Sequence, residues 1–156
     1  MAKRRKRTNK NVPAKGRLCK FADDLWSLAV RADWAHRCAI CGKRSDLNAH
    51  HLIHRWHFAV RYLLENGICL CGYCHIRCPK YSPHLNGLCF RAWLYENHPQ
   101  RASWCDLTTN HGHHFSLVTK NPQYYIGQIL RLKQYVPDEF EGVVGVRFAA
   151  WLEDQE

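Results

Sequence analysis

Residues 38–75 read CAICGKRSDLNAHHLIHRWHFAVRYLLENGICLCGYCH, and this stretch decides the fold. It begins with one C-x-x-C pair, Cys38 with Cys41, and a second pair, Cys71 with Cys74, directly precedes its last residue. Four thiolates can bind one zinc ion in a closed tetrahedral site, which contributes folding free energy and leaves no position open for chemistry. The sequence therefore predicts a structural Zn²⁺ held by these four cysteines.

The other cysteines leave alternatives open. Cys69 and Cys78 lie beside the second pair and could replace one of its ligands. The thiols could also be reduced and packed as small apolar side chains. Cys19, Cys89 and Cys105 are expected in the core or at incidental positions. A second metal cluster is conceivable from Cys105, His111, His113 and His114.

Two adjacent histidines, His50 and His51, lie between the cysteine pairs. Consecutive side chains of a strand point to opposite faces, so one imidazole can face a metal ion while the other faces a substrate. A neutral imidazole can take a proton from water near neutral pH, and a metal ion can stabilise charge on a phosphate. The pair suits metal-assisted phosphodiester hydrolysis, although taken alone it would more simply be an exposed polar pair.

The net charge of +10 is concentrated at the N-terminus. Residues 1–20 carry nine Lys or Arg and no acid, whereas the remaining 136 residues carry 14 basic and 13 acidic side chains. We predict that residues 1–17 form a disordered basic arm that binds nucleic acid, the alternative being a solvated tail. The candidate DNA contacts in the arm are Lys3, Arg4, Arg5, Lys6 and Arg7.

The composition excludes several classes of protein. No run of 18 apolar residues exists, and no apolar segment follows the basic N-terminus, so neither a membrane span nor a secretory signal is predicted. Nine cysteines in a reducing compartment bind metal more readily than they form disulfides. We therefore expect a cytoplasmic protein without a small-molecule cofactor.

Apolar periodicity predicts an α+β fold. Helices are expected over residues 21–36, 88–97 and 123–135, and strands over residues 47–53 and 68–71. A further helix should open at Cys74–His75 and end early because of Pro79 and Pro83. The intervening segments are predicted as a loop or short helical turn (54–65), an irregular stretch (98–121) and an apolar tail that could be strand or helix (141–152).

The order of these motifs resembles that of the HNH (His-Me finger) endonuclease family. His50-His51, Asn66 and His75 follow the H-H, N, H spacing of that family, and C-A-I-C with L-C-G-Y-C-H is similar to its zinc-containing branch. A-D-D-L-W-S-L-A-V-R and N-G-I-C-L-C look like segments of small phage and prophage HNH proteins. The resemblance covers residues 20–95 and implies a ββα-metal finger with a structural four-cysteine zinc site, flanked by helices.

The resemblance also implies a role for each matched residue. His51 would be the general base that activates water, and His50 and His75 would bind one catalytic divalent metal. Asn66 would hold the intervening loop by hydrogen bonds to its backbone and so orient His51. Two basic loop positions would contact phosphate, or only carry surface charge: Arg55 and Arg61.

The third metal ligand departs from the family pattern. Relatives often place a histidine one turn after the C-H corner, where this chain has Pro79. His84 lies six residues before Phe90 and nine before Trp93, which matches the family spacing if residues 76–83 contain an insertion. We therefore expect His84 to be the third ligand. The histidine set is compatible with Zn²⁺, Ni²⁺, Mn²⁺ or Mg²⁺. Because Mg²⁺ prefers oxygen ligands, we do not expect it to bind most tightly.

These observations predict three regions and one main function. The arm (1–17) precedes an endonuclease core (18–100) and a mostly helical C-terminal extension of unknown role (101–156). The core would hydrolyse DNA phosphodiester bonds, one strand per site, so a double-strand break requires a homodimer or two successive nicks. The alternatives are an inactive zinc-containing nucleic-acid-binding module and, ranked last, a thiol redox or metal-handling protein.

Overall fold

The computed structural model describes residues 12–109 and 121–154. Six α-helices, two strands and two short turns of 3₁₀ and π type occur in this part of the chain. In order they are α1 (Lys15–Asp33), β1 (Leu47–His51), the 3₁₀ turn η1 (Leu64–Asn66), β2 (Gly67–Cys71), the π-helical turn η2 (Tyr73–Arg77), α2 (Gly87–Asn97), α3 (Pro99–Thr109), α4 (Pro122–Lys133), α5 (Pro137–Val144) and α6 (Val146–Glu153). The predicted α+β class is confirmed.

The two strands form an antiparallel hairpin in which His50 pairs with Ile68 and His51 with Gly67. β2 is buried along its whole length, whereas every residue of β1 is only partly buried. The first strand is therefore the one whose side chains remain accessible. β1 ends at His51, two residues earlier than predicted, because Ile53 bonds to the side chain of Asn66 instead of extending the ladder.

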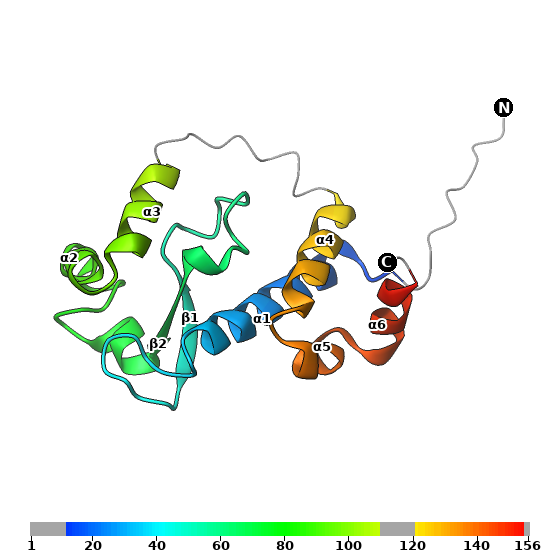
Figure 1. Ribbon diagram of the computed structural model, residues 1–156, viewed down its shortest axis with the longest axis horizontal. Coiled ribbons are helices and arrows are strands. Elements are labelled where there is room, and N and C mark those ends of the chain that lie inside the picture. Colours follow the sequence, from blue (N-terminus) through cyan, green and yellow to red (C-terminus); the bar gives the residue numbers. More distant parts are fainter. Residues whose placement is uncertain (1–11, 110–120, 155–156) are drawn as a thin grey trace.

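The two larger of the three apolar cores in the described residues lie on either side of the hairpin. The larger core joins α1 to α4, α5 and α6 and includes Trp26 and Tyr62. The smaller core packs the cysteine pairs and β2 against α2. Figure 1 shows α1 running between these two halves, with β1 and β2 at one end of it and α4 alongside. The C-terminal helices thus complete the core that α1 begins.

Several predicted boundaries differ from the structure. α1 starts at Lys15, six residues before the predicted start and inside the predicted disordered arm, because Leu18 is fully buried in the larger core. Its end comes at Asp33, since Ala35 and His36 adopt left-handed backbone angles. The apolar tail, left open between strand and helix, is helical (α5 and α6).

The prediction of an irregular segment over residues 98–121 was wrong for residues 99–109, which form α3. Pro99 is its first residue, a position that tolerates proline because the first amide of a helix needs no partner. Ala102 and Cys105 are its buried side chains. Two buried positions one turn apart are a weak periodic pattern, which explains why the helix was missed. Residues 110–120 lie outside the described part.

Gly67 marks a close approach of β2 to α1. A Cβ on this residue would overlap Cγ2 of Val30 and lie 3.2 Å from Cζ2 of Trp26. Val30 is fully buried and β-branched, so it cannot move aside easily.

Gly67→Ala is accordingly expected to lower the free energy of unfolding by about 1–3 kcal/mol, as in other overpacked cores. Gly127→Ala, in α4 where an added Cβ meets no atom within 4 Å, should instead stabilise the protein by about 0.5–1 kcal/mol. Urea denaturation of both variants measures the difference. Equal stability of the two would show that β2 does not approach α1 this closely.

Within residues 12–109 and 121–154, none of the helices combines the length and apolar character that crossing a membrane requires.

Candidate functional site

The four cysteines of the two C-x-x-C pairs meet at one point. Their sulfur atoms cluster at 3.6–3.9 Å from one another, with Sγ of Cys41 and Sγ of Cys71 3.7 Å apart. Tetrahedral zinc with Zn–S bonds of about 2.3 Å requires sulfur separations of about 3.8 Å. The cluster could therefore hold a structural metal ion such as zinc. We name it the four-cysteine cluster (Cys38, Cys41, Cys71 and Cys74).

Local backbone geometry prepares the four-cysteine cluster. The first pair lies in a tight turn in which Gly42 donates its N–H to the carbonyl of Cys38 at 2.8 Å and adopts a φ of 74°. Burial raises the pKa of the Cys38 thiol, but hydrogen bonds from the backbone of Cys71, Cys41 and Ile40 outweigh burial and the pKa is lowered. Backbone donors aimed at this sulfur favour its thiolate, which is the form that binds metal, whereas burial raises the pKa of the Cys41 and Cys74 thiols.

A second cluster joins three histidines from separate segments. Nδ1 of His50 lies 3.0 Å from Nε2 of His75, and Nε2 of His84 lies 3.1 Å from the same nitrogen. One ring nitrogen from each histidine falls within 4.8 Å of the other two. We name these residues the three-histidine cluster (His50, His75 and His84). No other group of this kind occurs in the described ranges besides the four-cysteine cluster.

The contacts of the three-histidine cluster fit a bound cation better than hydrogen bonds alone. Nε2 of His75 has either one hydrogen or one lone pair, so it cannot make two good hydrogen bonds in the same plane. A cation with bonds of about 2.0–2.1 Å to nitrogen would satisfy all three rings. Burial, followed by the neighbouring histidines, lowers the pKa of His50 to about 3, and burial also lowers the pKa of His75. Both imidazoles are neutral near pH 7, the state in which they bind metal.

Ser82 builds the bend that brings His84 to the cluster. Its hydroxyl is fully buried and donates to the carbonyl of His75 at 2.8 Å. The same oxygen accepts the N–H of His84 at 3.2 Å and the N–H of Leu85 at 3.3 Å. Ser82 was not among the residues predicted from the sequence, although a serine two residues before a candidate ligand is typical of such a turn.

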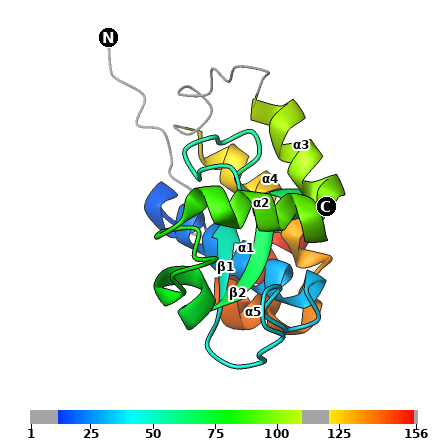
Figure 2. The ribbon, with the colours of Figure 1, turned by 90° about the vertical axis from the view of Figure 1, so that its left-hand side faces the viewer.

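The segment after β2 is not the continuous helix that a simple ββα unit would have. His75 lies in η2, a π-helical turn of five residues, and the next regular helix, α2, begins only at Gly87. The bend between them contains Pro79 and Pro83, which cannot continue a helix. Figure 2 shows η2 and α2 as separate segments beside the hairpin. The expected helix at Cys74–His75 is therefore limited to this one turn.

His51 lies on the opposite face of β1 from His50 and is held on two sides. Its ring stacks on Trp26 of α1 with centroids 3.7 Å apart and an interplanar angle of 12°. Its Nε2 lies 3.0 Å from the carbonyl oxygen of Arg61. A carbonyl can only accept, so Nε2 carries the hydrogen and Nδ1 carries the lone pair. Burial lowers the pKa of His51 to about 4, so the ring is neutral near pH 7.

Asn66 pins the loop between the strands. It is fully buried, and its Oδ1 accepts the N–H of Ile53 at 2.6 Å. Its Nδ2 donates to the carbonyls of Ile53 at 3.0 Å and Val60 at 3.2 Å. These bonds fix the chain just after His51, which is the segment that Asn66 was expected to hold.

Arg61 is placed differently from the sequence prediction. It is 5% exposed, and its guanidinium makes bonds of 2.7–3.0 Å to the carboxylate of Asp23 in α1. Burial lowers the pKa of Arg61, but the hydrogen bonds to Asp23 outweigh it and the pKa is raised, so the guanidinium keeps its charge. Because the guanidinium is buried and paired with Asp23, Arg61 does not fit the predicted phosphate contact. The ion pair instead holds Arg61 in place, so that its backbone carbonyl can bond to His51.

The other predicted nucleic-acid contacts divide into two groups. Arg55 is exposed and lies in the loop after His51, with its guanidinium 6.0 Å from the ring of Trp56. The arm residues lie outside the described part of the chain, as do the histidines of the conceivable second metal cluster: Lys3, Arg4, Arg5, Lys6, Arg7, His111, His113 and His114.

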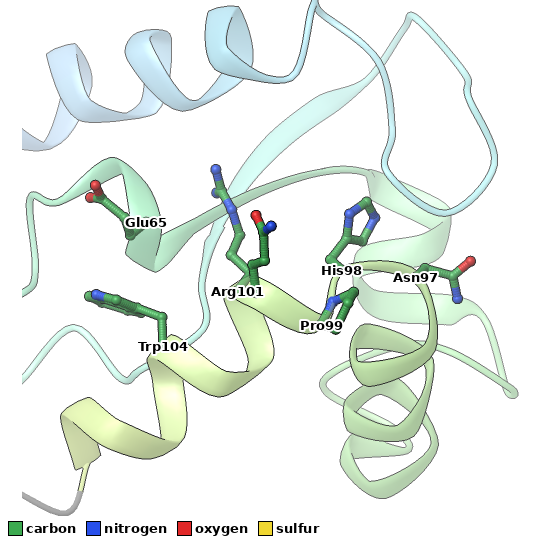
Figure 3. Close-up of a pocket in the computed structure, with 7 residues that line it drawn as sticks. Glu65, Asn97, His98, Pro99, Arg101 and Trp104 are labelled. Carbon is green, nitrogen blue, oxygen red and sulfur yellow. The ribbon is translucent and has the colours of Figure 1, made fainter.

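A cavity of about 580 Å³ lies elsewhere, at the junction of α3 with η1. Figure 3 shows Glu65 and Trp104 at one end of it, His98 and Asn97 at the other, and Arg101 between them. Arg101 donates to the carbonyls of Leu64 and Gly67 and, at 2.8 Å, to the carboxylate of Asp33. This arginine therefore ties α3 to the start of β2 and to α1, and the cavity contains no member of either cluster.

No family model, curated protein or solved structure matched this chain.

Proposed function

We propose that this chain is a metal-dependent endonuclease that hydrolyses DNA phosphodiester bonds. The observation that carries the proposal is the arrangement around β1. His50 joins a three-imidazole cluster on one face of the strand, while His51 is fixed on the other face as a neutral ring. The HNH-like motif order of the sequence agrees with this arrangement.

The three-histidine cluster would hold the catalytic divalent ion, for which its donor set and spacing are suitable. When bound, that ion would supply Lewis-acid stabilisation of charge on the phosphate and the leaving oxygen. The three histidines bring one ring nitrogen each to a single point and leave the remaining positions open to oxygen ligands. A set of three imidazoles fits Zn²⁺, Ni²⁺ or Mn²⁺.

His51 would take the proton from the attacking water. Its hydrogen at Nε2 is fixed by the Arg61 carbonyl, which leaves Nδ1 as the accepting atom. Stacking on Trp26 holds the ring plane, and the Asp23–Arg61 ion pair holds the carbonyl. A phosphodiester anion bound beside the ring would raise its pKa from the low value of the free protein toward neutrality.

The charge of the site suits a polyanionic substrate. Residues 47–64 contain two Arg and four His and no Asp or Glu. The exposed Arg55 follows His51 by four residues and is available to a phosphate. The basic first 20 residues add a sequence-independent attraction to nucleic acid.

Nicking of supercoiled plasmid DNA tests the proposal. Purified protein is expected to convert supercoiled to open-circular DNA when Mn²⁺, Ni²⁺, Zn²⁺ or Mg²⁺ is added, and not when a chelator is in excess. If none of these ions supports cleavage while the protein still binds DNA, the alternative of an inactive zinc-containing binding module replaces this proposal.

His84→Ala tests the third ligand. Loss of one of three nitrogens should weaken binding of the catalytic ion by at least the roughly 10- to 100-fold typical of lost outer-shell partners. The concentration of divalent ion needed for half-maximal nicking should rise accordingly. His98→Ala, which removes a histidine outside the three-histidine cluster, is the matched control. An unchanged ion requirement in His84→Ala would remove His84 from the ligand set.

A further inference from the structure

The loop after β1 presents four consecutive exposed side chains. His54, Arg55, Trp56 and His57 are all exposed, and Trp56 is 67% exposed. Single exposed apolar side chains are common, so the feature that distinguishes Trp56 is the set of groups around its ring. We name residues 54–57 the HRWH tip.

The HRWH tip is not a loose end of chain. Asn66 holds Ile53 before it and Val60 after it, and the hydroxyl of Tyr124 donates to the carbonyl of Phe58 at 2.6 Å. Within the tip, the backbone N–H of Trp56 donates to Nδ1 of His54 at 3.3 Å. An exposed indole is thus carried on a loop anchored to η1 and α4. Anchoring lowers the entropy lost when a ligand binds to the tip.

The surroundings of Trp56 indicate the chemistry of that ligand. The His54 ring lies 6.1 Å from the indole at an interplanar angle of 19°, and the Arg55 guanidinium lies 6.0 Å from it. No acid occurs between residues 47 and 64. A flat π face beside a guanidinium matches a nucleobase with its phosphate, which proteins bind by stacking and charge together.

We propose that Trp56 is a stacking platform for a nucleobase that is not stacked in a continuous duplex, and that Arg55 binds the adjoining phosphate. This inference rests on the proposed action on DNA and specifies the form of DNA that the site prefers. A base within intact duplex has both faces covered, so the indole can contact it only where the helix is gapped, frayed or distorted. The protein should therefore favour DNA with an unpaired segment beside the bond that it cuts.

Binding to two labelled DNAs tests this inference: a continuous duplex, and the same duplex with a single-stranded gap. Affinity is measured by fluorescence anisotropy without added divalent ions, so that cleavage plays no part. Trp56→Ala should weaken binding to the gapped DNA roughly 5- to 150-fold, the loss of one base stack. Binding to the continuous duplex should be nearly unchanged, because phosphate contacts carry it.

Two further variants make the result specific. Trp56→Phe keeps an aromatic face and should retain most of the preference for gapped DNA. Tyr95→Ala is the matched control, because Tyr95 is 40% exposed and has the Arg91 guanidinium 5.7 Å from its ring, but lies on α2 outside the HRWH tip. This variant should bind both DNAs like the wild type. An equal loss of affinity for both DNAs in Trp56→Ala would overturn the inference. No loss of affinity for either DNA would also overturn it and would indicate that the indole contacts a protein partner instead.

The binding result and the cleavage result are independent. A wild-type protein that prefers gapped DNA through Trp56 but never nicks plasmid supports this inference and refutes the proposed catalysis. A protein that nicks plasmid but binds both DNAs equally well refutes this inference alone.

Discussion

Replacing Cys74 with serine is expected to unfold most of the protein at ambient temperature. Cys74 is buried in the four-cysteine cluster, whose sulfur spacing suits a tetrahedral zinc ion. Structural zinc sites contribute about 10–16 kcal/mol in isolated zinc-finger peptides, which equals or exceeds the about 5–15 kcal/mol by which domains of this size are stable. A three-ligand site would bind zinc far more weakly and leave the smaller core without its centre.

Circular dichroism and metal analysis check this expectation. The wild type should contain one chelator-resistant zinc per chain and Cys74→Ser much less, with a loss of the cooperative thermal transition. Cys89→Ser is the matched control, because Cys89 is exposed and outside the cluster. A Cys74→Ser protein that melts like Cys89→Ser would mean that the four sulfurs gather without holding a metal ion.

Replacing His51 with alanine is expected to reduce plasmid nicking by about 100- to 10,000-fold, the contribution typical of a general base. The loss should appear at every concentration of divalent ion, because His51 is not in the three-histidine cluster. His84→Ala should differ by responding to added ion. This contrast separates loss of proton transfer from loss of the metal.

The stacking of His51 on Trp26 requires a check of stability. His51→Ala leaves the indole face open and should lower the melting temperature, whereas His51→Asn fills part of the space and still cannot act as a base at neutral pH. Both variants should be inactive if the imidazole is the base. His36→Asn, an exposed histidine whose left-handed backbone asparagine tolerates, is the control that should keep full activity. Nicking by His51→Asn at the wild-type rate would exclude the role of His51 as base.

Much of the hairpin could be predicted from the chain. The C-x-x-C pairs fix two turns that must meet if one ion binds both, and the strands adjoining them then pair. Gly67 and Asn66 also have identifiable reasons, since one permits close packing on α1 and the other satisfies three backbone groups of a buried loop. His84, which lies beside His75, was expected there from its spacing to Phe90 and Trp93 compared with the motif of the family that the chain resembles.

The tertiary structure decided what surrounds those motifs. Neither Asp23 nor Trp26 was predicted to belong to the site, and only the folded structure shows that Asp23 pairs with Arg61 and that Trp26 stacks on His51. The sequence likewise did not predict Ser82, Arg101 or the helix α3. Ser82 and Arg101 act through contacts with residues elsewhere in the chain, and the apolar periodicity of α3 is weak.

The sequence alone determined which groups can bind metal, because ligand chemistry and spacing are local properties of the chain. Whether Arg61 faces a phosphate or a carboxylate depended on Asp23, which lies more than 30 residues away in the chain. Which nitrogen of His51 keeps its hydrogen depended on the carbonyl of Arg61 in the following loop. Burial and hydrogen bonding are set by the assembled core, and local pattern cannot supply them.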